Sequence, residues 1–210
     1  VSALLLARYG GRWPLAYWKP VATGARLGRD VETVELLAGR RALVLPETFL
    51  YREPLSPHSA ARLEGREVLV PALLSDFARH ARPERGLLVE GVGGLLVPFD
   101  DRGYLLADLL VAMGLPCLVV AHSGLGTLNH TLLTLEALRA RRLLPAAVVL
   151  NGPRHPENRR TLEALAGVEA VLEVEPLPIL NAAAVERAAA GLDPEGRLER
   201  WLRPAAAAAE

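Results

Sequence analysis

Short apolar runs alternate along this chain with longer segments whose apolar residues recur at helical spacing. Glycine, proline or polar residues bound each short run, which is typical of buried strands. We expect such strands at residues 14–18, 86–90, 117–121, 146–150 and 168–174. Because these runs are continuously apolar, the sheet that they form is predicted to be covered on both faces.

The segments between these strands carry helix signals. Asp30 is placed as the N-cap of a helix over residues 31–37, and Ser56 followed by Pro57 is typical of another helix start. Helical spacing of apolar residues predicts further helices over residues 71–82, 105–113, 128–141 and about 156–166. This alternation predicts a three-layer, doubly wound α/β fold with a mostly parallel sheet.

Composition and charge narrow the class of protein. With 210 residues, 51% of them apolar and 23% charged, the chain suffices for one globular domain. We assign this domain to residues 1–203 and expect the alanine-rich tail, residues 204–210, to fray. The 24 basic and 24 acidic side chains leave no positive surplus for nucleic acid or a membrane surface. A single cysteine and no apolar run of about 18 residues predict a cytoplasmic protein without a membrane span.

In α/β sheets of this kind, ligands bind beyond the carboxyl ends of the strands, so residues just past each strand are the candidates. Lys19 follows the first predicted strand and is the only lysine in the sequence. The other 23 of the 24 lysine and arginine side chains are arginine. A compact ammonium suits a phosphate or a developing anion where a planar guanidinium does not. We therefore favour a functional Lys19 over a surface lysine.

Glu90 ends an apolar strand and is followed by Gly91, Val92, Gly93 and Gly94. A carboxylate is costly to bury there unless it is paired or binds a metal such as Mg²⁺. The glycines let backbone N–H groups approach an anion closely. The alternative is a glycine turn with an exposed glutamate.

Two further strand ends carry candidate ligands. Residues 122–130 are small and polar and lead into a helix, whose free N–H groups favour a carboxylate or phosphate. His122 and His130 lack cysteine partners, which argues against zinc. Asn151 offers a donor and an acceptor on one amide, as an adenine edge requires, although a turn role would also explain it.

Residues 17–24, 53–58, 89–94 and 124–130 and Asn151, in that order, resemble the dethiobiotin synthetase family over about residues 1–180. The resemblance implies a P-loop NTPase-like fold and a homodimer with the substrate at its interface. It also implies a ligase of biotin biosynthesis that uses Mg²⁺, ATP and CO2 to close a cyclic urea on 7,8-diaminononanoate. The reaction passes through a carbamate and a carbamic–phosphoric anhydride.

The resemblance also implies roles for matching positions. Lys19 is the catalytic residue, and Asp30 and Glu90 are the magnesium ligands. The substrate contacts are Thr23 and, across the dimer interface, Gly126, Thr127, Leu128 and Asn129. The ATP contacts are Asp30, Glu90, Gly91, Val92, Gly93, Asn151, Gly152, Glu175, Pro176 and Leu177.

The chain departs from the family pattern in two places. No Gly-x-x-x-x-Gly-Lys-Ser/Thr loop occurs in the 210 residues, so we expect the first strand and this phosphate-binding loop upstream of residue 1. Without that loop, ATP binding and turnover are predicted to be very weak. Glu175 stands where the family usually has proline.

Alternative interpretations of the function are another P-loop enzyme, such as a cobyric acid synthase-like amidotransferase or a partitioning ATPase, and a non-catalytic dimerisation module.

Overall fold

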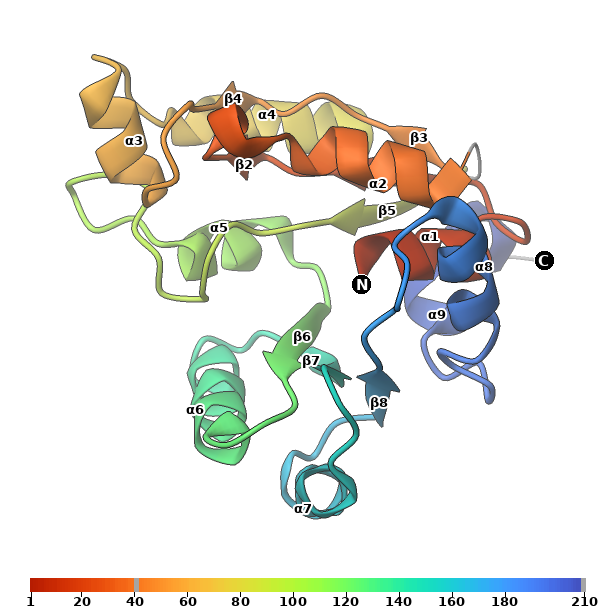
Figure 1. Ribbon diagram of the computed structural model, residues 1–210. Coiled ribbons are helices and arrows are strands. Elements are labelled where there is room, and N and C mark those ends of the chain that lie inside the picture. Colours follow the sequence, from red (N-terminus) through yellow and green to blue (C-terminus); the bar gives the residue numbers. More distant parts are fainter. Residues whose placement is uncertain (40–41, 209–210) are drawn as a thin grey trace.

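Parallel strands flanked by helices make up the structure, a computed structural model that describes residues 1–39 and 42–208 (Figure 1). One sheet has the order β3-β1-β5 and another the order β6-β7-β8, while β2 pairs with β4. Every pair within these sheets is parallel. The strands are β1 Leu15–Trp18, β2 Val21–Ala22, β3 Leu43–Val44, β4 Phe49–Leu50, β5 Gly86–Val89, β6 Cys117–His122, β7 Pro145–Asn151 and β8 Ala170–Val174.

The helices lie mostly between successive strands. They are α1 Ser2–Tyr9, α2 Asp30–Ala38, α3 Pro57–Leu63, α4 Val70–His80, α5 Leu106–Met113, α6 Thr127–Ala140, α7 Pro156–Leu165, α8 Ala182–Ala190 and α9 Glu199–Leu202. Short 3₁₀ turns lie at Ala25–Leu27 and Ala206–Ala208. Across the described ranges, none of these helices combines the length and apolar character that crossing a bilayer requires.

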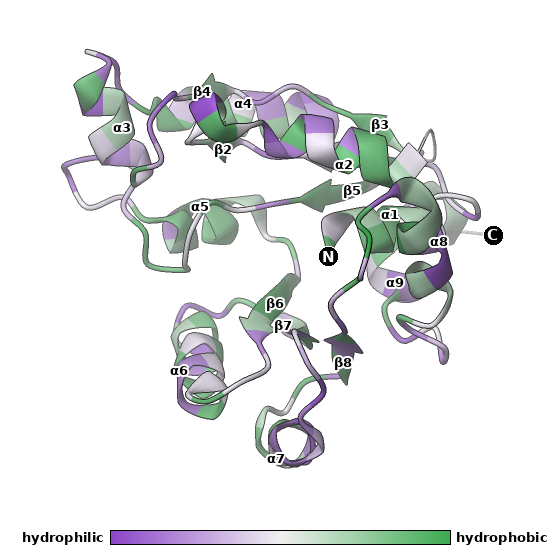
Figure 2. Cartoon of the chain, viewed as in Figure 1, coloured by the Kyte–Doolittle hydropathy of each residue, from purple (hydrophilic) through white to green (hydrophobic). Residues whose placement is uncertain are grey.

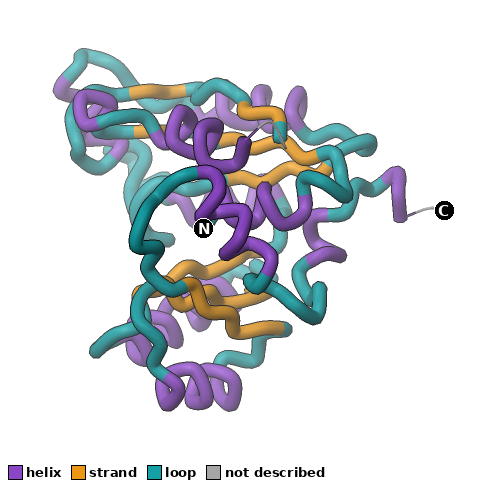
Figure 3. The backbone as a smooth tube through the Cα atoms, turned by 45° about the vertical axis from the view of Figure 1, so that its right-hand side comes forward, coloured by secondary structure: helices purple, strands orange, loops and turns teal. Residues whose placement is uncertain are grey.

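Helices cover both faces of the two main sheets, and α1, α2 and α8 pack together on a face that the sheets share (Figures 1 and 3). Their core cluster takes in Tyr17 of β1, Val149 of β7 and Leu172 of β8. Beneath the β1–β5 sheet, a second cluster contains Trp18, Leu73 of α4 and Leu109 of α5. A third, with residues of α6 and α7, lies under the β6–β8 sheet. Figure 2 shows the apolar strands between helices whose outer faces are hydrophilic.

The predicted α/β class is confirmed, and every strand predicted from the sequence is present within about two residues of its expected bounds. The strands are divided between separate sheets, however. In the part of the chain that is described, β5 and β6 are edge strands: β5 is paired only with β1, and β6 only with β7. The short strands β2, β3 and β4 and the helices α8 and α9 were not predicted. Val120, in the middle of β6, is about half exposed along this one-sided edge.

The predicted N-cap role of Asp30 is wrong. The helix begins one residue earlier, with Arg29 in the N-cap position and the Thr33 N–H donating to its carbonyl. The Arg29 guanidinium is held by Glu47, with Nη2 2.5 Å from Oε2, and this pair fixes the chain where α2 starts. Asp30 is thereby placed in the first turn, where a carboxylate is favoured by the helix dipole and its side chain is free to bind elsewhere.

Part of the tail, residues 204–210, is also placed. Ala206 donates its N–H to the carbonyl of Pro83 at 2.8 Å, and Pro204 is buried. Residues 209–210 lie outside the described residues. Fraying of the tail stays a prediction.

Candidate active site

Lys19 lies at the point where β1 and β5 end side by side. Trp18 pairs with Val89, and the Glu90 N–H donates to the Trp18 carbonyl at 2.9 Å, so the next residues of both strands are neighbours. Lys19 Nζ lies 2.8 Å from Glu90 Oε1 and 3.1 Å from Asp30 Oδ2. It also donates to the Gly91 carbonyl at 3.4 Å. The three N–H donors of the ammonium thus face three oxygen atoms.

These three side chains come from separate elements: the end of β1, the start of α2 and the end of β5. Lys19 is only 6% exposed, whereas about half of the Asp30 side chain is open to solvent. The ammonium is therefore buried beneath a carboxylate that reaches solvent. The sequence placed Lys19 and Glu90 at strand ends, and the structure adds that these ends are neighbours and that Lys19 also contacts Asp30.

Lys19 and Glu90 each shift the pKa of the other in the direction that favours its charged form. Burial lowers the pKa of Lys19, but the carboxylates of Glu90 and Asp30 outweigh burial and hold that pKa above its usual value. For Glu90, burial raises the pKa, but the charge and hydrogen bond of Lys19, with the Ser2 hydroxyl, bring it below its ordinary range. Both ions are consequently stabilised in their charged forms near neutral pH.

Glycines shape the loop that follows Glu90. Gly93 has φ +68°, a left-handed conformation that favours glycine. At Gly91, a Cβ would lie 2.8 Å from Leu106 Cδ2, so the Leu106 side chain of α5 would have to shift to make room for it. The loop therefore stays close to α5 and keeps its backbone next to Lys19.

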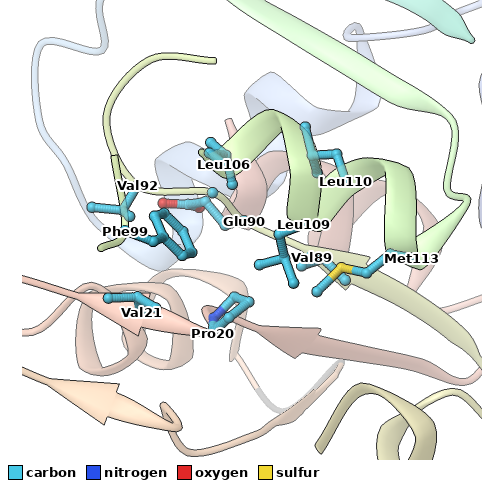
Figure 4. A pocket seen from close by; sticks show the side chains of 11 residues that line it. Pro20, Val21, Val89, Glu90, Val92, Phe99, Leu106, Leu109, Leu110 and Met113 are labelled. Carbon is cyan, nitrogen blue, oxygen red and sulfur yellow. The ribbon is translucent and has the colours of Figure 1, made fainter. Parts of the chain in front are cut away.

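An apolar wall closes one side of Glu90 (Figure 4). A cavity of about 10 Å³ lies there, and Glu90 is the only charged side chain that lines it. Its other walls come from residues near β2 and from α5, including Val21, Leu106 and Met113. Room for about one water molecule keeps this side of the carboxylate poorly solvated, which strengthens its interaction with Lys19.

Thr23 follows β2 and leads into Gly24, whose φ of +80° makes a tight turn. The Gly24 N–H donates to the Glu53 carbonyl at 2.9 Å, and a Cβ at Gly24 would lie 3.3 Å from Pro54 Cβ. Residues 53–58, which carried no role in the sequence analysis beyond the family resemblance, therefore hold the turn that positions Thr23.

A second cluster lies at the ends of β7 and β8. Asn151 pairs with Val174, and the Gly152 N–H donates to the Val174 carbonyl at 2.9 Å. Gly152 has φ +143°, and a Cβ there would lie 2.5 Å from Ser123 Oγ, so only glycine fits. Glu175 follows β8 and pairs with Arg154, with Oε1 2.8 Å from Nε.

The rest of the predicted nucleoside segment follows Glu175. Pro176 is exposed, while Leu177 packs partly against the core cluster of α1, α2 and α8. Asn151, Gly152 and Glu175 thus lie together, as expected of neighbouring strand ends. No hydrogen bond or ion pair among the described residues joins this cluster to Lys19, Asp30 or Glu90.

The predicted substrate contacts at residues 126–129 form the start of α6. Gly126, the N-cap residue, has φ +90°, and the Thr127 hydroxyl is buried 3.3 Å from that of Thr131. Leu125, immediately before, is fully exposed. Within residues 1–39 and 42–208, the structure of the single chain gives no hydrogen bond between this segment and the Lys19 cluster.

Two residues of the site were not found from the sequence. The Ser2 hydroxyl, on α1, donates to Glu90 Oε2. The Tyr17 hydroxyl is buried on β1, two residues before Lys19. The strand period of two gives a signal for Tyr17, since it places residues 17 and 19 on one face of the sheet. Ser2 depends on tertiary packing of α1 and carries no such signal.

The donor set suits a hard cation. Over the described residues, no group of three or more histidine, cysteine, aspartate or glutamate side chains could by itself hold a metal ion. Asp30 and Glu90 nevertheless meet around one positive charge, that of Lys19. Two carboxylates, with phosphate oxygens and water completing the shell, are a typical donor set for Mg²⁺.

Comparison with known proteins gives consistent matches over most of the chain. A family model described as an AAA domain matches residues 1–184. An ATP-dependent dethiobiotin synthetase BioD of Paramagnetospirillum magneticum is 43% identical over 87% of this chain and 83% of its own length. A protein of the same name from Agrobacterium fabrum is 40% identical over 82% of this chain and 79% of its own length. The biotin biosynthesis bifunctional protein BioCD of Bordetella avium is 41% identical over 89% of this chain and 38% of its own length.

The lowered pKa of Glu90 predicts a pH dependence of stability in metal-free buffer. Because the folded-state pKa lies below the ordinary value of 4.5, the stability from this carboxylate is complete above about pH 4.5 and is lost as pH falls through the folded-state pKa. Glu90→Gln removes that contribution. Urea unfolding at pH 7 and pH 4 should show a smaller loss of unfolding free energy in the variant than in the parent. Equal losses in both proteins would contradict this description of Glu90.

Proposed function

Because this chain belongs to the family of ATP-dependent dethiobiotin synthetases, we propose that it closes a cyclic urea on 7,8-diaminononanoate with CO2 and ATP. Ligase activity in biotin biosynthesis follows from that membership. The observation that supports the proposal most strongly is the buried Lys19 between Asp30 and Glu90, beside a glycine loop at the strand ends. This combination offers positive charge, carboxylate ligands and backbone N–H groups in one place.

In the proposed reaction, one substrate amine adds CO2 to give a carbamate. The carbamate oxygen attacks the terminal phosphorus of ATP and releases ADP. The second amine then attacks the carbamate carbon, and phosphate leaves as the ring closes. The protein contributes mainly positioning and charge stabilisation, as in phosphoryl transfer generally.

Lys19 is the proposed catalytic residue. Its ammonium carries three donors on a flexible stem and can follow negative charge from the carbamate to the transferring phosphoryl group. In the structure these donors are taken up by Glu90, Asp30 and Gly91. Lys19 must therefore release the carboxylates when it turns towards the reactants.

Asp30 and Glu90 are the proposed magnesium ligands. Lys19 marks a place between them where a positive charge is stabilised. Asp30 and Glu90 would hold a magnesium ion, whose charge would screen the nucleotide oxygens. The same charge would compensate Asp30 and Glu90 once Lys19 has left them.

The second cluster is proposed to bind the nucleoside. Asn151 is exposed at the end of β7 and offers both a donor and an acceptor to the base. Gly152 keeps the backbone open beside it, and the Glu175–Arg154 pair borders the same strand ends. Phosphates extending towards Gly91, Val92 and Gly93 would meet the glycine loop, and Thr23 is proposed to contact the diamine.

A homodimer is proposed to complete the substrate site. Residues 126–129 start a helix of 14 residues, whose N–H groups favour the substrate carboxylate. Among the described residues they form no hydrogen bond with Lys19, and the adjacent Leu125 is fully exposed. Supply of this segment by a partner copy accounts for both observations.

The reaction is tested by measuring phosphate release from ATP with Mg²⁺ and bicarbonate, with and without 7,8-diaminononanoate. The protein should be expressed from its complete open reading frame. We expect release that depends on the diamine. Release that ignores the diamine would indicate a different ATPase, and a lack of any release would contradict the ligase assignment.

Lys19→Arg tests the catalytic role. Arginine keeps the charge, but its planar guanidinium cannot occupy the same close position between Asp30 and Glu90. We expect diamine-dependent turnover to fall by about tenfold or more, since loss of one electrostatic contact to the reacting group has effects of that scale or larger. Thermal unfolding serves as the control for folding. Turnover within about twofold of the parent in a folded variant would remove Lys19 from the mechanism.

A further inference from the structure

Tyr17 is completely buried, and its hydroxyl makes no hydrogen bond of normal geometry among the described residues. The group that acts on the pKa of this hydroxyl as a hydrogen-bond partner is Glu90. Its ring lies in the core cluster under α1, α2 and α8, and it pairs with Leu88 across the β1–β5 ladder. A buried hydroxyl without a partner costs free energy, and phenylalanine would fill the same space without that cost. The hydroxyl therefore calls for an explanation other than packing.

The carboxylate of Glu90 lies on the side of the sheet where the Tyr17 ring packs. Because strand side chains alternate, Tyr17 lies on the same face as Lys19, and Leu88 lies on the same face as Glu90. Ser2 on α1 reaches Glu90 Oε2, which places that carboxylate on the α1 side where the Tyr17 ring packs. Burial raises the pKa of Tyr17, and the negative charges of Glu90, Asp30 and Glu47 raise it further.

Glu90 has two partners at hydrogen-bond distance in the structure, and the Tyr17 hydroxyl is a third group that lowers its pKa as a hydrogen-bond donor. Lys19 holds Oε1 at 2.8 Å, and Ser2 holds Oε2. If Lys19 turns towards the reactants, as the proposed function requires, Oε1 loses its partner and the carboxylate is free to rotate. A metal ligand needs a further group to fix its orientation at that moment.

We propose that Tyr17 is a positioning residue for Glu90: its hydroxyl donates to this carboxylate when Lys19 leaves it, and so orients Glu90 towards the divalent cation. The inference rests on the proposed function, because it takes Glu90 as a magnesium ligand. Tyr17 does not touch the reactants. Its place in β1, fixed by complete burial of the ring in the core cluster, makes it suitable for holding a mobile carboxylate.

Tyr17→Phe removes only the hydroxyl. We expect the half-saturating Mg²⁺ concentration for turnover to rise on the order of tenfold, as for other groups that orient a metal ligand. The affinity for Mn²⁺, measured by electron paramagnetic resonance without turnover and with a non-hydrolysable ATP analogue, should weaken in parallel. The melting temperature should stay equal or rise, because an unpartnered buried hydroxyl is removed.

Tyr9→Phe is the matched control. Tyr9 is also buried, but its hydroxyl donates to Asp193 Oδ2 at 2.5 Å, away from the site. This variant should lower the melting temperature and leave the Mg²⁺ dependence unchanged. The pair therefore separates a loss of stability from a loss of metal positioning.

An unchanged Mg²⁺ and Mn²⁺ dependence in Tyr17→Phe would overturn the inference. So would a comparable change in Tyr9→Phe, since the effect would then be a general response to a lost buried hydroxyl. Asp30→Asn distinguishes this failure from failure of the proposed function. If Asp30→Asn weakens Mn²⁺ binding and Tyr17→Phe does not, only the role of Tyr17 is wrong. If neither variant changes Mn²⁺ binding, the assignment of the metal site to Asp30 and Glu90 is wrong.

Discussion

The rest of the site depends on one buried ammonium held between two carboxylates. Removing Lys19 from water is costly, and its pairing with Glu90 and Asp30 compensates that cost. The contact also fixes the relative positions of three elements, because Lys19 follows β1, Glu90 follows β5 and Asp30 begins α2. A charge cluster of this kind binds structure together in the resting protein and exposes exchangeable ligands when another cation arrives.

Backbone geometry explains why the remaining candidate residues can approach a ligand. Gly24 turns the chain at Thr23, and Gly91 and Gly93 keep the loop after Glu90 against α5. Gly152 does the same beside Asn151, where any side chain would collide with Ser123. Each turn lies beyond a strand end, which is where α/β folds bind their ligands. The two clusters are therefore complementary parts of one proposed nucleotide and substrate site.

Local sequence signals were sufficient for the five longer strands, for most of the helices and for part of the site. Lys19, Glu90 and Asn151 were found because each follows a continuous apolar strand. The contact of Asp30 with Lys19 depends on where α2 starts, and that is set by the distant pair of Arg29 with Glu47. Ser2 could not be found because only tertiary packing brings α1 to Glu90. The division into separate sheets depends on long-range strand pairing that no local pattern records. Helix α8 does have a local signal, the N-cap Asn181 before an alanine-rich run, which the sequence analysis did not use.

We propose that Lys19 occupies the place of a divalent cation between Asp30 and Glu90. The most direct test compares Mn²⁺ binding to the parent and to Lys19→Met at pH 7.5, without nucleotide, using electron paramagnetic resonance. Methionine keeps a flexible apolar side chain of similar length and removes the competing charge. If Lys19 and the cation share these carboxylates, we expect several-fold tighter Mn²⁺ binding by the variant. Equal or weaker binding would show that Lys19 and the metal do not share these carboxylates.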